Sequence, residues 1–504
     1  MNKRVTLAVM LSLFLISSTS AIFLDDFLVN VEKRAGWQDW VRLTVDLSGN
    51  IYITYIDIFY SGTYDSAVGY IKKYNASGNR LLGPVRLTPE GIFVSNGGNL
   101  AVSSSGRVAI TWGLTPKLFD VPTHPYVQVL DSNLNEITPL FRVDTDFDSL
   151  NLPNANVSDL DMGSSGFFTI IWEFSDTAFY QRFDSLGIPI GHNMPAETPE
   201  CSPCKGTQFP RLGMSSNGKL ALALDARLPN PQADFLPVAR TFDSAGSAIV
   251  NGILVSCDSD TTYCTCALVD SCLAGQYADI AIQDNGNFLS VFSGCSECEP
   301  TNSVFARVLD SLGSPISSIF EVNTENTKDD FLLPLVVTDG RGGYLVGWTD
   351  SRNQESYEGR RDLFLQRYDS LGNPIGINFR VNNLRGSKGH EEIGFDVACD
   401  GENVYIVWLD NREHATYNWD VYAQVMDLDL VGTYMLGDAN FDQQITLADV
   451  IYTVNYIFKG NPMPEGDQLV IDVNGDCKVS LSDVIYEVNY IFGKGPPFVP
   501  GCLP

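Results

Sequence analysis

Two stretches near the C-terminus place oxygen-bearing side chains at the intervals needed to surround a metal ion. They span residues 438–449 and 472–483. Both carry such side chains at loop positions 1, 3, 5, 9 and 12, have a hydrophobic residue at position 8, and leave a main-chain carbonyl available at position 7. This is the order in which a twelve-residue loop wraps a hard divalent cation such as calcium. The two stretches therefore predict two Ca²⁺ sites.

The similarity between the two copies continues beyond the loops, over residues 449–458 and 483–492. Each segment repeats apolar residues at helical spacing, so that these residues share one face. The apolar positions are Val450, Ile451, Val454, Ile457 and Phe458 in the first segment, and Val484, Ile485, Val488, Ile491 and Phe492 in the second. We expect two helices that pack against each other through these faces, each preceded by a loop and not by another helix.

With these features the C-terminal region resembles the dockerin domain, a duplicated calcium-loop module that attaches enzymes and binding proteins to cohesin-bearing scaffolds. The resemblance covers about residues 437–502. It implies these calcium ligands: Asp438, Asn440, Asp442, Gln444 through its carbonyl, Thr446 and Asp449, then Asp472, Asn474, Asp476, Lys478 through its carbonyl, Ser480 and Asp483. Position 6, usually Gly in the family, is Gln443 in one loop and Cys477 in the other.

The resemblance also implies a partner for this module. Dockerins bind a cohesin-type protein, so we expect docking to such a partner in an extracellular assembly. Two alternatives remain at this point: the module docks onto the chain's own N-terminal domain, or it is a calcium-stapled cap that binds no partner.

The N-terminus and the composition restrict where the protein works and what it binds. Residues 1–21 have a basic start, an apolar run and small residues before a cleavage point, which predicts a signal peptide and a secreted chain. No later run of about 20 apolar residues occurs, so no membrane span is expected. The net charge of −29 argues against nucleic acid and against anionic membrane surfaces as partners.

The cysteines suit an oxidising compartment. Eight of the eleven lie between Cys201 and Cys298, two more are Cys477 and Cys502, and Cys399 stands alone in an apolar segment. We expect disulfides within the group of eight and between the C-terminal two, and a free, buried thiol at Cys399. Zinc held by the two Cys-x-x-Cys pairs of the large group is the alternative, although their spacing is not that of a compact zinc finger.

The region between the two ends is a longer repeat. A turn of the type Asp-Ser-Leu-Gly recurs in seven more or less similar copies, with its acidic or amide residue at positions 75, 131, 184, 243, 310, 369 and 427. Before each copy, a Gly turn leads into alternating hydrophobic residues, which is typical of strands joined by hairpins. Units with about four strands predict a mainly β fold, a seven-bladed β-propeller over residues 22–432. The small α-helical dockerin-like domain with paired EF-hand-type loops would then occupy residues 433–504. The repeats also resemble those of many exported bacterial propellers.

The way in which the ring closes can also be predicted. A strand of the type Phe-x-Val-Asn, as at residues 379–382, follows the earlier copies but is missing after residue 427. A matching segment, Phe-Leu-Val-Asn, stands at residues 27–30. We expect this N-terminal segment to supply the outer strand of the last blade.

One recurrent element of the propeller has a functional interpretation. Trp348 and Trp408 are each followed by Asp-x-Arg, which most often forms an ion pair that stabilises a turn. The functional interpretation is a ring of Trp and Arg around one mouth of the propeller that stacks on sugar faces.

We therefore predict a secreted calcium-binding protein whose propeller recognises an extracellular glycan or protein without catalysis and whose module docks it in a polysaccharide-degrading or surface assembly. The main alternative is a propeller glycoside hydrolase or polysaccharide lyase, which would need a pair of carboxylates at the central channel. A third is a structural adhesion or surface protein whose module binds calcium but no partner.

Overall fold

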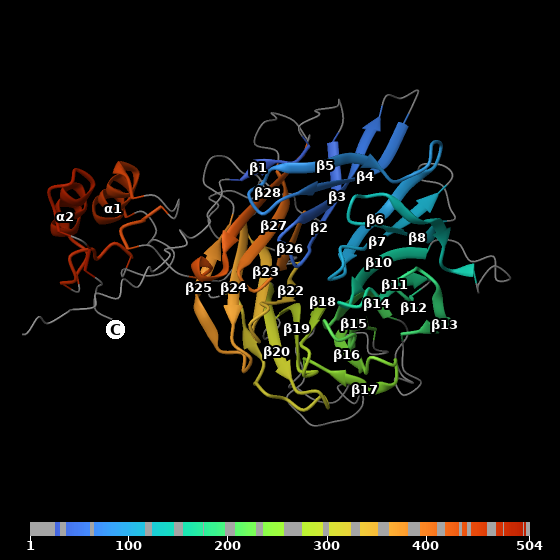
Figure 1. Cartoon of the computed structure of the whole chain (residues 1–504). Helices are drawn as coiled ribbons and strands as arrows, with labels where there is room; N and C mark the ends of the chain where they lie inside the picture. The colour runs from blue at the N-terminus through green and yellow to red at the C-terminus, as the bar shows by residue number, and fades with distance from the viewer. Residues whose placement is uncertain are drawn as a thin grey trace, which may run out of the picture.

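The chain forms a ring of β-sheets followed by two helices (Figure 1). The computed structural model describes residues 26–30, 37–60, 65–115, 123–145, 155–174, 176–196, 207–227, 235–256, 275–295, 302–323, 333–350, 362–381, 394–410, 419–432, 436–440, 445–460, 470–476, 478–496 and 498–499. Within these residues there are seven four-stranded antiparallel sheets, which confirms the predicted seven-bladed β-propeller with a small α-helical C-terminal region. The proposed signal peptide lies outside the described residues.

The blades share one plan, in which each sheet runs from the central channel to the rim. The innermost strands are β2 (Trp37–Val45), β6 (Phe93–Val102), β10 (Ala155–Met162), β14 (Thr207–Met214), β18 (Gly275–Ile282), β22 (Leu335–Thr338) and β26 (Phe395–Cys399). The second strands are β3 (Ile51–Tyr60), β7 (Val108–Thr115), β11 (Phe168–Phe174), β15 (Leu220–Ala226), β19 (Phe288–Cys295), β23 (Tyr344–Asp350) and β27 (Asn403–Asp410). We number the blades 1 to 7 in this order.

The outer half of each blade completes the sheet. The third strands are β4 (Asp65–Tyr74), β8 (His124–Leu130), β12 (Thr177–Phe183), β16 (Leu236–Phe242), β20 (Asn302–Leu309), β24 (Asp362–Tyr368) and β28 (Asp420–Asp427). The outermost strands are β5 (Arg80–Arg86), β9 (Glu136–Arg142), β13 (Pro189–Pro195), β17 (Ala248–Leu254), β21 (Phe320–Glu321), β25 (Pro374–Arg380) and, in blade 7, β1 (Phe27–Leu28).

The recurrent turns join the third and fourth strands in blades 1 to 6, whereas in blade 7 the equivalent Asp427 caps the short helix at residues 428–430. In blade 6 the Asp369 carboxylate accepts hydrogen bonds from the main-chain N–H groups of Leu371 and Asn373, at 2.8 and 2.9 Å. Asp310 in blade 5 repeats this arrangement. Such Asx turns hold the chain in a tight reversal. The repeated acidic residue therefore serves the turn, as the sequence predicts.

The N-terminal segment closes the ring, which confirms the prediction for residues 27–30. Strand β1 pairs antiparallel with β28, with Phe27 opposite Ala423 and Leu28 opposite Tyr422. Asn30 fixes the end of this strand, because its side-chain amide donates to Asp420 at 2.7 Å. The first and last parts of the propeller therefore lie in the same blade, where strand pairing and side-chain hydrogen bonds hold them together.

Tryptophans of the second strands fill the space between blades. Trp112, Trp172 and Trp348 have no exposed surface, and Trp408 is almost completely buried. Trp348, for example, belongs to an apolar cluster that includes Leu289 of the preceding blade. Burial of one such side chain contributes on the order of 2–3 kcal/mol. The hypothesis that these tryptophans stack on a ligand at the mouth is therefore wrong; they are core residues.

The Asp-x-Arg elements serve the same core where the structure describes them. Asp410 is fully buried, and one of its carboxylate oxygens accepts a hydrogen bond from the indole N–H of Trp408 at 3.3 Å. The arginines that follow, Arg352 and Arg412, lie outside the described residues. Asp410 thus holds a core tryptophan in place.

Beyond blade 7 the chain makes the short 3₁₀ helix η3 (Leu428–Leu430) and the helices α1 (Leu447–Lys459) and α2 (Leu481–Ile491). The two α-helices pack against each other, as predicted. They lie beside blade 6 (Figure 1), where the Arg380 guanidinium donates a hydrogen bond to the carbonyl of Asn440 at 3.4 Å. In the part of the chain that the structure describes, no helix is long and apolar enough to cross a membrane.

The prediction that all the apolar helix residues lie in the contact between the helices is wrong in part. Val450 is buried, but Ile451 and Phe458 are 59% and 62% exposed. Their counterparts in α2, Ile485 and Phe492, are both 61% exposed. The cause is the loop residue at position 12, since Asp449 and Asp483 must face inward to reach their loops. This requirement turns each helix about its axis and leaves one edge of its apolar face outside.

The cysteine predictions are tested at one position. Cys399, at the end of β26, is a free thiol as expected, although its side chain is half-buried and not completely enclosed. Most of the other cysteines lie outside the described residues, so the predicted disulfides stay a prediction.

Candidate functional site

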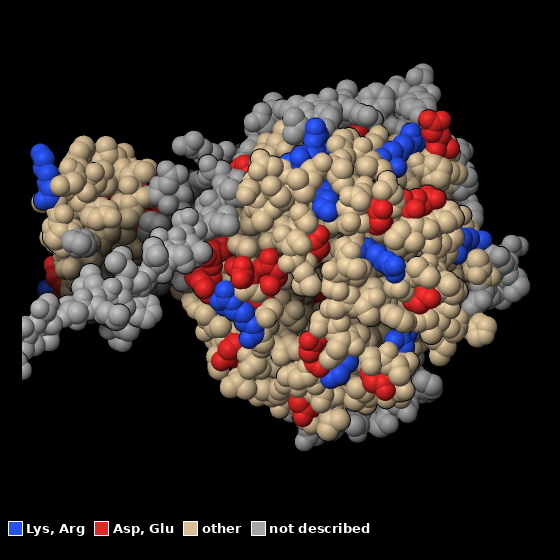
Figure 2. All heavy atoms as spheres, in the orientation of Figure 1, with Lys and Arg blue, Asp and Glu red and all other residues tan. Residues whose placement is uncertain are grey.

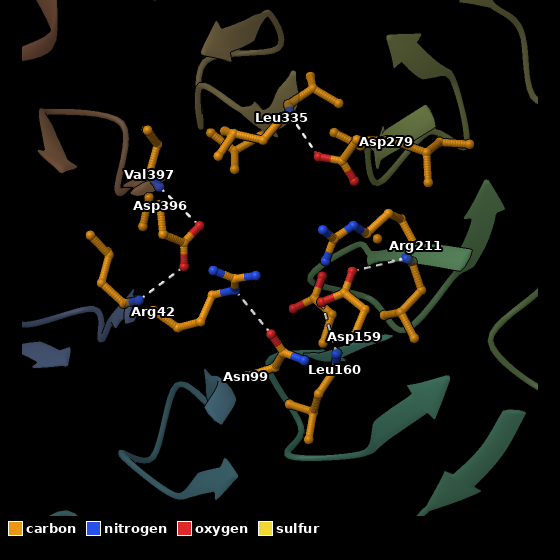
Figure 3. Close-up of a pocket in the computed structure, with 18 of the residues that line it drawn as sticks. Arg42, Asn99, Asp159, Leu160, Arg211, Asp279, Leu335, Asp396 and Val397 are labelled. Carbon is orange, nitrogen blue, oxygen red and sulfur yellow. Dashed lines mark hydrogen bonds between the residues drawn. The ribbon is translucent and has the colours of Figure 1, made fainter. Parts of the chain in front are cut away.

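The innermost strands project one residue from each blade into the central channel. The residues at this position are Arg42, Asn99, Asp159, Arg211, Asp279, Leu335 and Asp396, and each pairs with the same position of its second strand. Figure 3 shows them facing one another around a pocket of about 720 Å³. We call these seven residues the channel ring. It combines two guanidinium groups with three carboxylates. An active site in the channel would have to be built from these groups.

The carboxylates of the channel ring are occupied by the main chain. Innermost strands are sheet edges, so their N–H groups need acceptors. Across the blade boundary Asp159 accepts from Leu212 N–H at 3.0 Å, Asp279 from Val336 N–H at 2.8 Å, and Asp396 from Leu43 N–H at 2.9 Å. Asp159 and Asp396 also accept from the next residue of their own strand. Each carboxylate therefore links two blades.

Burial raises the pKa values of the channel carboxylates and of their neighbours. Burial raises the pKa of Asp279 to about 7 and the pKa of Asp396 to about 6. Burial also raises the pKa of Asp161 and of Asp225 to about 7, although both accept main-chain N–H bonds from the following blade. Desolvation thus outweighs the hydrogen bonds that favour the charged form of these groups.

One mouth of the channel carries three aromatic residues, of which Phe209 is exposed and Trp40 and Tyr277 are half-buried. Trp40, Phe209 and Tyr277 occupy the same place in blades 1, 4 and 5, two residues before the channel-ring position, and all three line the pocket. Each stands at a β-bulge in the innermost strand. None is fully buried, and Phe209 is 43% exposed. We call these three residues the aromatic mouth.

The aromatic mouth is built on strained backbone. Trp40, Phe209 and Tyr277 have φ values of 48°, 47° and 57°, a left-handed conformation that costs a bulky residue about 1–2 kcal/mol. Blade 2 has Gly97 two residues before its own ring residue, with φ 96°, and glycine adopts this conformation without cost. Trp40 packs in part against an apolar core cluster, so a function is indicated most directly for the exposed ring of Phe209.

Carboxylates hold the strained main chain at all three positions. The N–H of Trp40 donates to Asp39 at 2.8 Å, and the N–H of Phe209 donates to Glu173 at 3.1 Å. The N–H of Tyr277 donates to Asp225 at 2.5 Å. The rings of Phe209 and Tyr277 also contact each other, with centroids 4.9 Å apart and planes inclined by 47°. The mouth is therefore pre-organised, and Phe209 and Tyr277 present a joined aromatic surface.

The sequence interpretation missed the aromatic mouth. The signal is present, because Gln38, Gln208 and Gln276 precede the three aromatic residues by one or two positions. However, it appears only after the innermost strands are aligned on the channel ring, and the bulges that turn the rings toward the mouth are set by pairing with the second strands.

The second predicted calcium loop brings three acidic side chains together. One carboxylate oxygen each of Asp472, Asp476 and Asp483 lies within 4.8 Å of the others. Asp472 and Asp483 are buried, and Asp476 is exposed. Ser480 and Asp483 also form the capping box of α2, in which Asp483 accepts from Ser480 N–H at 2.9 Å. This cluster of hard oxygen donors at one loop fits Ca²⁺.

The remaining predicted ligands of the second loop lie along the same turn. The Asn474 N–H donates to Asp483 at 3.4 Å, and Lys478 N–H donates to Asp476 at 3.0 Å. These bonds link the main chain of Asn474 and Lys478 to carboxylates of the same loop.

The first loop has the same frame where the structure describes it. Thr446 and Asp449 form the capping box of α1, and Asp449 accepts from Thr446 N–H at 2.8 Å and from Asn440 N–H at 3.2 Å. Asp438 and Asp449 are buried. The predicted ligands Asp442 and Gln444 lie outside the described residues.

A further carboxylate stands between the two loops. Glu487, one helical turn after Asp483, is 1% exposed, and its Oε1 has no hydrogen-bond partner among the described residues. Burial, followed by the charges of Asp449, Asp438 and Asp483, raises its pKa to about 8. An orphaned buried oxygen at this place also fits a module built to hold cations.

Comparison with known proteins gives matches in structure only. No protein-family model matches the sequence, and no curated protein matches it. The β-propeller domain of the Trilobed protease from Pyrococcus furiosus, described as having an open velcro topology, is 14% identical with a TM-score of 0.44, covering 77% of this chain and 93% of that chain. An alpha-L-arabinanase from Penicillium chrysogenum is 13% identical with a TM-score of 0.41, covering 81% and 99%. An ulvan lyase is 8% identical with a TM-score of 0.46, covering 78% and 96%. The function of the present protein must therefore be argued from its own residues.

Proposed function

We propose that this is a secreted, calcium-binding recognition protein: its propeller binds an extracellular glycan at the aromatic mouth without cleaving it, and its C-terminal module attaches it to a partner. The observation that carries the first part is the aromatic mouth, three bulky rings held on left-handed backbone at equivalent bulges. Strain of this kind is retained where it positions a ligand-binding group.

A sugar is the ligand class that suits the mouth best. Aromatic faces pack on the apolar C–H faces of pyranose rings, and the edges of the sugars need hydrogen-bonding groups nearby. The pocket offers such a group in Asn156, which is exposed, whereas Asn96 is buried and bonds Asn156 at 2.9 Å and Val157 N–H at 3.3 Å. The pocket of about 720 Å³ falls in the range of ligand-binding cavities.

The hydrogen bonds of the channel carboxylates favour recognition over hydrolysis, although the raised pKa of Asp279, about 7, is the property that a general acid would need. A glycosidase needs one carboxyl group that gives up a proton and another that is free to attack or to activate water. The channel-ring carboxylates instead accept main-chain N–H bonds across blade boundaries. Glu173, at the mouth, accepts from Phe209 N–H. Moving any of them would loosen a blade junction.

The module supports the attachment part of the proposal. Both loops have the frame of a twelve-residue calcium site, and the second gathers three carboxylates. Leu447, Ile451 and Phe458 are exposed on α1, and their counterparts Leu481, Ile485 and Phe492 are exposed on α2. The module surface in Figure 2 is mostly uncharged around these helices. A duplicated apolar edge of this kind suits a protein partner of the cohesin type. If the module instead docked onto its own propeller, the Arg380–Asn440 hydrogen bond would be part of that interface.

The deciding experiment compares binding of the mature full chain to cellulose, chitin and xylan with binding of the Phe209→Gly, Tyr277→Gly double variant. Glycine keeps the left-handed backbone and removes both rings. We expect binding to at least one polysaccharide to weaken by about tenfold, because each aromatic contact is worth about 0.5–1.5 kcal/mol, with no fall in melting temperature. Leu47→Ala, at a turn residue that is 79% exposed, is the control.

Two results would count against the proposal. Equal binding by the double variant and the native chain would remove the aromatic mouth as the site. Release of reducing ends from the same polysaccharides would replace recognition with the glycosidase or lyase alternative.

A further inference from the structure

Two arginines of the channel ring reach into the central pocket from opposite walls. Arg42 belongs to β2 of blade 1 and Arg211 to β14 of blade 4, and Figure 3 shows their guanidinium groups turned toward each other across the pocket. Both residues are half-buried, so each keeps exposed surface inside the channel. The proposed function gives neither of them a role.

The hydrogen bonds of Arg42 leave part of its guanidinium unused. Its Nε donates to the side chain of Asn99 at 3.0 Å, and its Nη1 donates to the carbonyl of Val41 at 2.9 Å. In the part of the chain that the structure describes, Arg42 makes no ion pair and its Nη2 has no hydrogen-bond partner. Burial lowers the pKa of Arg42 although the charge of Asp396 opposes this change. The surroundings of Arg42 therefore compensate its positive charge only in part.

The carboxylates of the channel ring do not cancel the charge of the two arginines. Asp159, Asp279 and Asp396 accept main-chain N–H bonds from the neighbouring blades. Burial raises the pKa of Asp279 to about 7 and that of Asp396 to about 6, so protonation near neutral pH removes part of the negative charge. A guanidinium keeps its charge throughout this range. The ring therefore offers positive charge to a ligand more readily than negative charge.

The aromatic mouth lies next to the two arginines along the same strands. Trp40 precedes Arg42 by two residues, and Phe209 precedes Arg211 by two residues. Two residues of a strand span about 6–7 Å, and all four side chains line one pocket. A group that projects from a sugar at the mouth into the channel would therefore meet the guanidinium groups.

We propose that the channel ring binds the acid group of an anionic glycan, with Arg42 and Arg211 as donors beneath a sugar held at the aromatic mouth. This inference rests on the proposed glycan binding and names its ligand class. Guanidinium groups bind oxyanions through paired, charge-assisted hydrogen bonds. Uronic acids and sulfated sugars both supply such a group. The net charge of −29 repels an anionic glycan at long range, so selectivity for it must come from these short contacts.

The test is calorimetric binding of the mature full chain to sugars paired by charge. One pair is oligogalacturonates and their methyl esters, and the other is a sulfated galactan oligosaccharide and its desulfated form. We expect the native chain to prefer the charged member of one pair by about tenfold or more, and the pair concerned tells a carboxylate from a sulfate. Arg42→Gln should lose this preference and bind the neutral member as the native chain does. Arg42→Lys keeps the charge and should keep a preference of about threefold.

Two further variants separate binding from structural effects. Arg86→Gln is the matched control, because Arg86 is exposed on β5 at the rim and its loss changes the net charge equally; it should keep the native preference. Arg211→Gln tests the second donor and gives a result if Arg42→Gln does not fold. A merely structural arginine would weaken binding of both members of a pair alike, so the ratio of the two affinities is the decisive readout.

The outcomes distinguish this inference from the proposed function. Equal affinity of the native chain for the charged and neutral members would overturn the inference and leave glycan binding at the aromatic mouth standing. The native preference in both Arg42→Gln and Arg211→Gln would do the same. Absence of binding to all of these sugars and to the polysaccharides named above would overturn both proposals.

Discussion

Ring closure by β1 can be tested at a single residue, Asn30. Its side chain makes three buried hydrogen bonds in blade 7: it donates to Gln38 and to Asp420, both at 2.7 Å, and accepts from Val421 N–H at 2.8 Å. Asn30→Ala removes all three at the point where the N-terminal strand is held to the last blade. The Val421 N–H loses its partner in a fully buried setting.

The magnitude follows from these bonds. Each buried polar group that loses its partner costs about 1–3 kcal/mol, and partial rearrangement reduces the sum to about 3 kcal/mol. For a large domain that free energy corresponds to a fall in melting temperature of about 6 °C. Asn323→Ala is the matched variant, because Asn323 accepts from Val304 N–H at 2.6 Å in blade 5, where the outer strand is continuous with its own blade.

The assay is thermal unfolding together with hydrogen exchange. Asn30→Ala should lower the melting temperature more than Asn323→Ala, and it should speed exchange in β1 and β28 before the rest of the ring. Asn133→Ala, an exposed turn residue, should change neither. If Asn30→Ala changes stability by less than about 0.5 kcal/mol, or if exchange quickens uniformly around the ring, closure by β1 does not hold the propeller together.

Two further predictions concern the channel and the module. The raised pKa values of Asp161, Asp225 and Asp279, about 7, and of Asp396, about 6, mean that the folded protein binds protons more tightly than the unfolded chain, whose carboxyl groups titrate near pH 4. The contribution of these groups to the free energy of unfolding is therefore fully present below pH 4 and is lost as the pH rises to about 7. Calorimetry in calcium should then give a higher melting temperature at pH 5 than at pH 8. This difference should shrink in Asp161→Asn, and a melting temperature that rises with pH would contradict the burial argument. For the module, Ile451→Glu with Ile485→Glu should abolish the calcium-dependent retention of a partner from an extract of the source organism while Ca²⁺ affinity stays native; unchanged retention would place docking elsewhere.

Much of this architecture is legible in the amino-acid sequence because it repeats. An acidic or amide residue recurs at the outer turns for a local reason, since in Asp369 the carboxylate bonds main-chain groups two and four residues ahead. The segment at residues 27–30 can be matched to the missing strand because it carries the same residues as its equivalents. Local chemistry and repetition together are enough to predict both the blades and the closure.

The aromatic mouth could not be predicted in this way. Left-handed backbone is unfavourable for Trp40, Phe209 and Tyr277, so local preference points away from the observed conformation. What imposes it is pairing with the second strand and the carboxylates that hold each N–H. The exposure of Ile451 and Phe458 has a similar origin, because the orientation of α1 follows from the inward-facing Asp449 and not from the apolar pattern alone.

Three acidic residues show how a carboxylate group takes different roles in this chain. Asp369 has its acceptors filled by its own turn, and Asp396 has them filled by main-chain groups of two blades. Both are therefore explained by the fold. Glu487 keeps a buried oxygen that no described residue satisfies and has acidic neighbours. Hydrogen bonds of the described residues therefore do not explain Glu487 as they explain the other two.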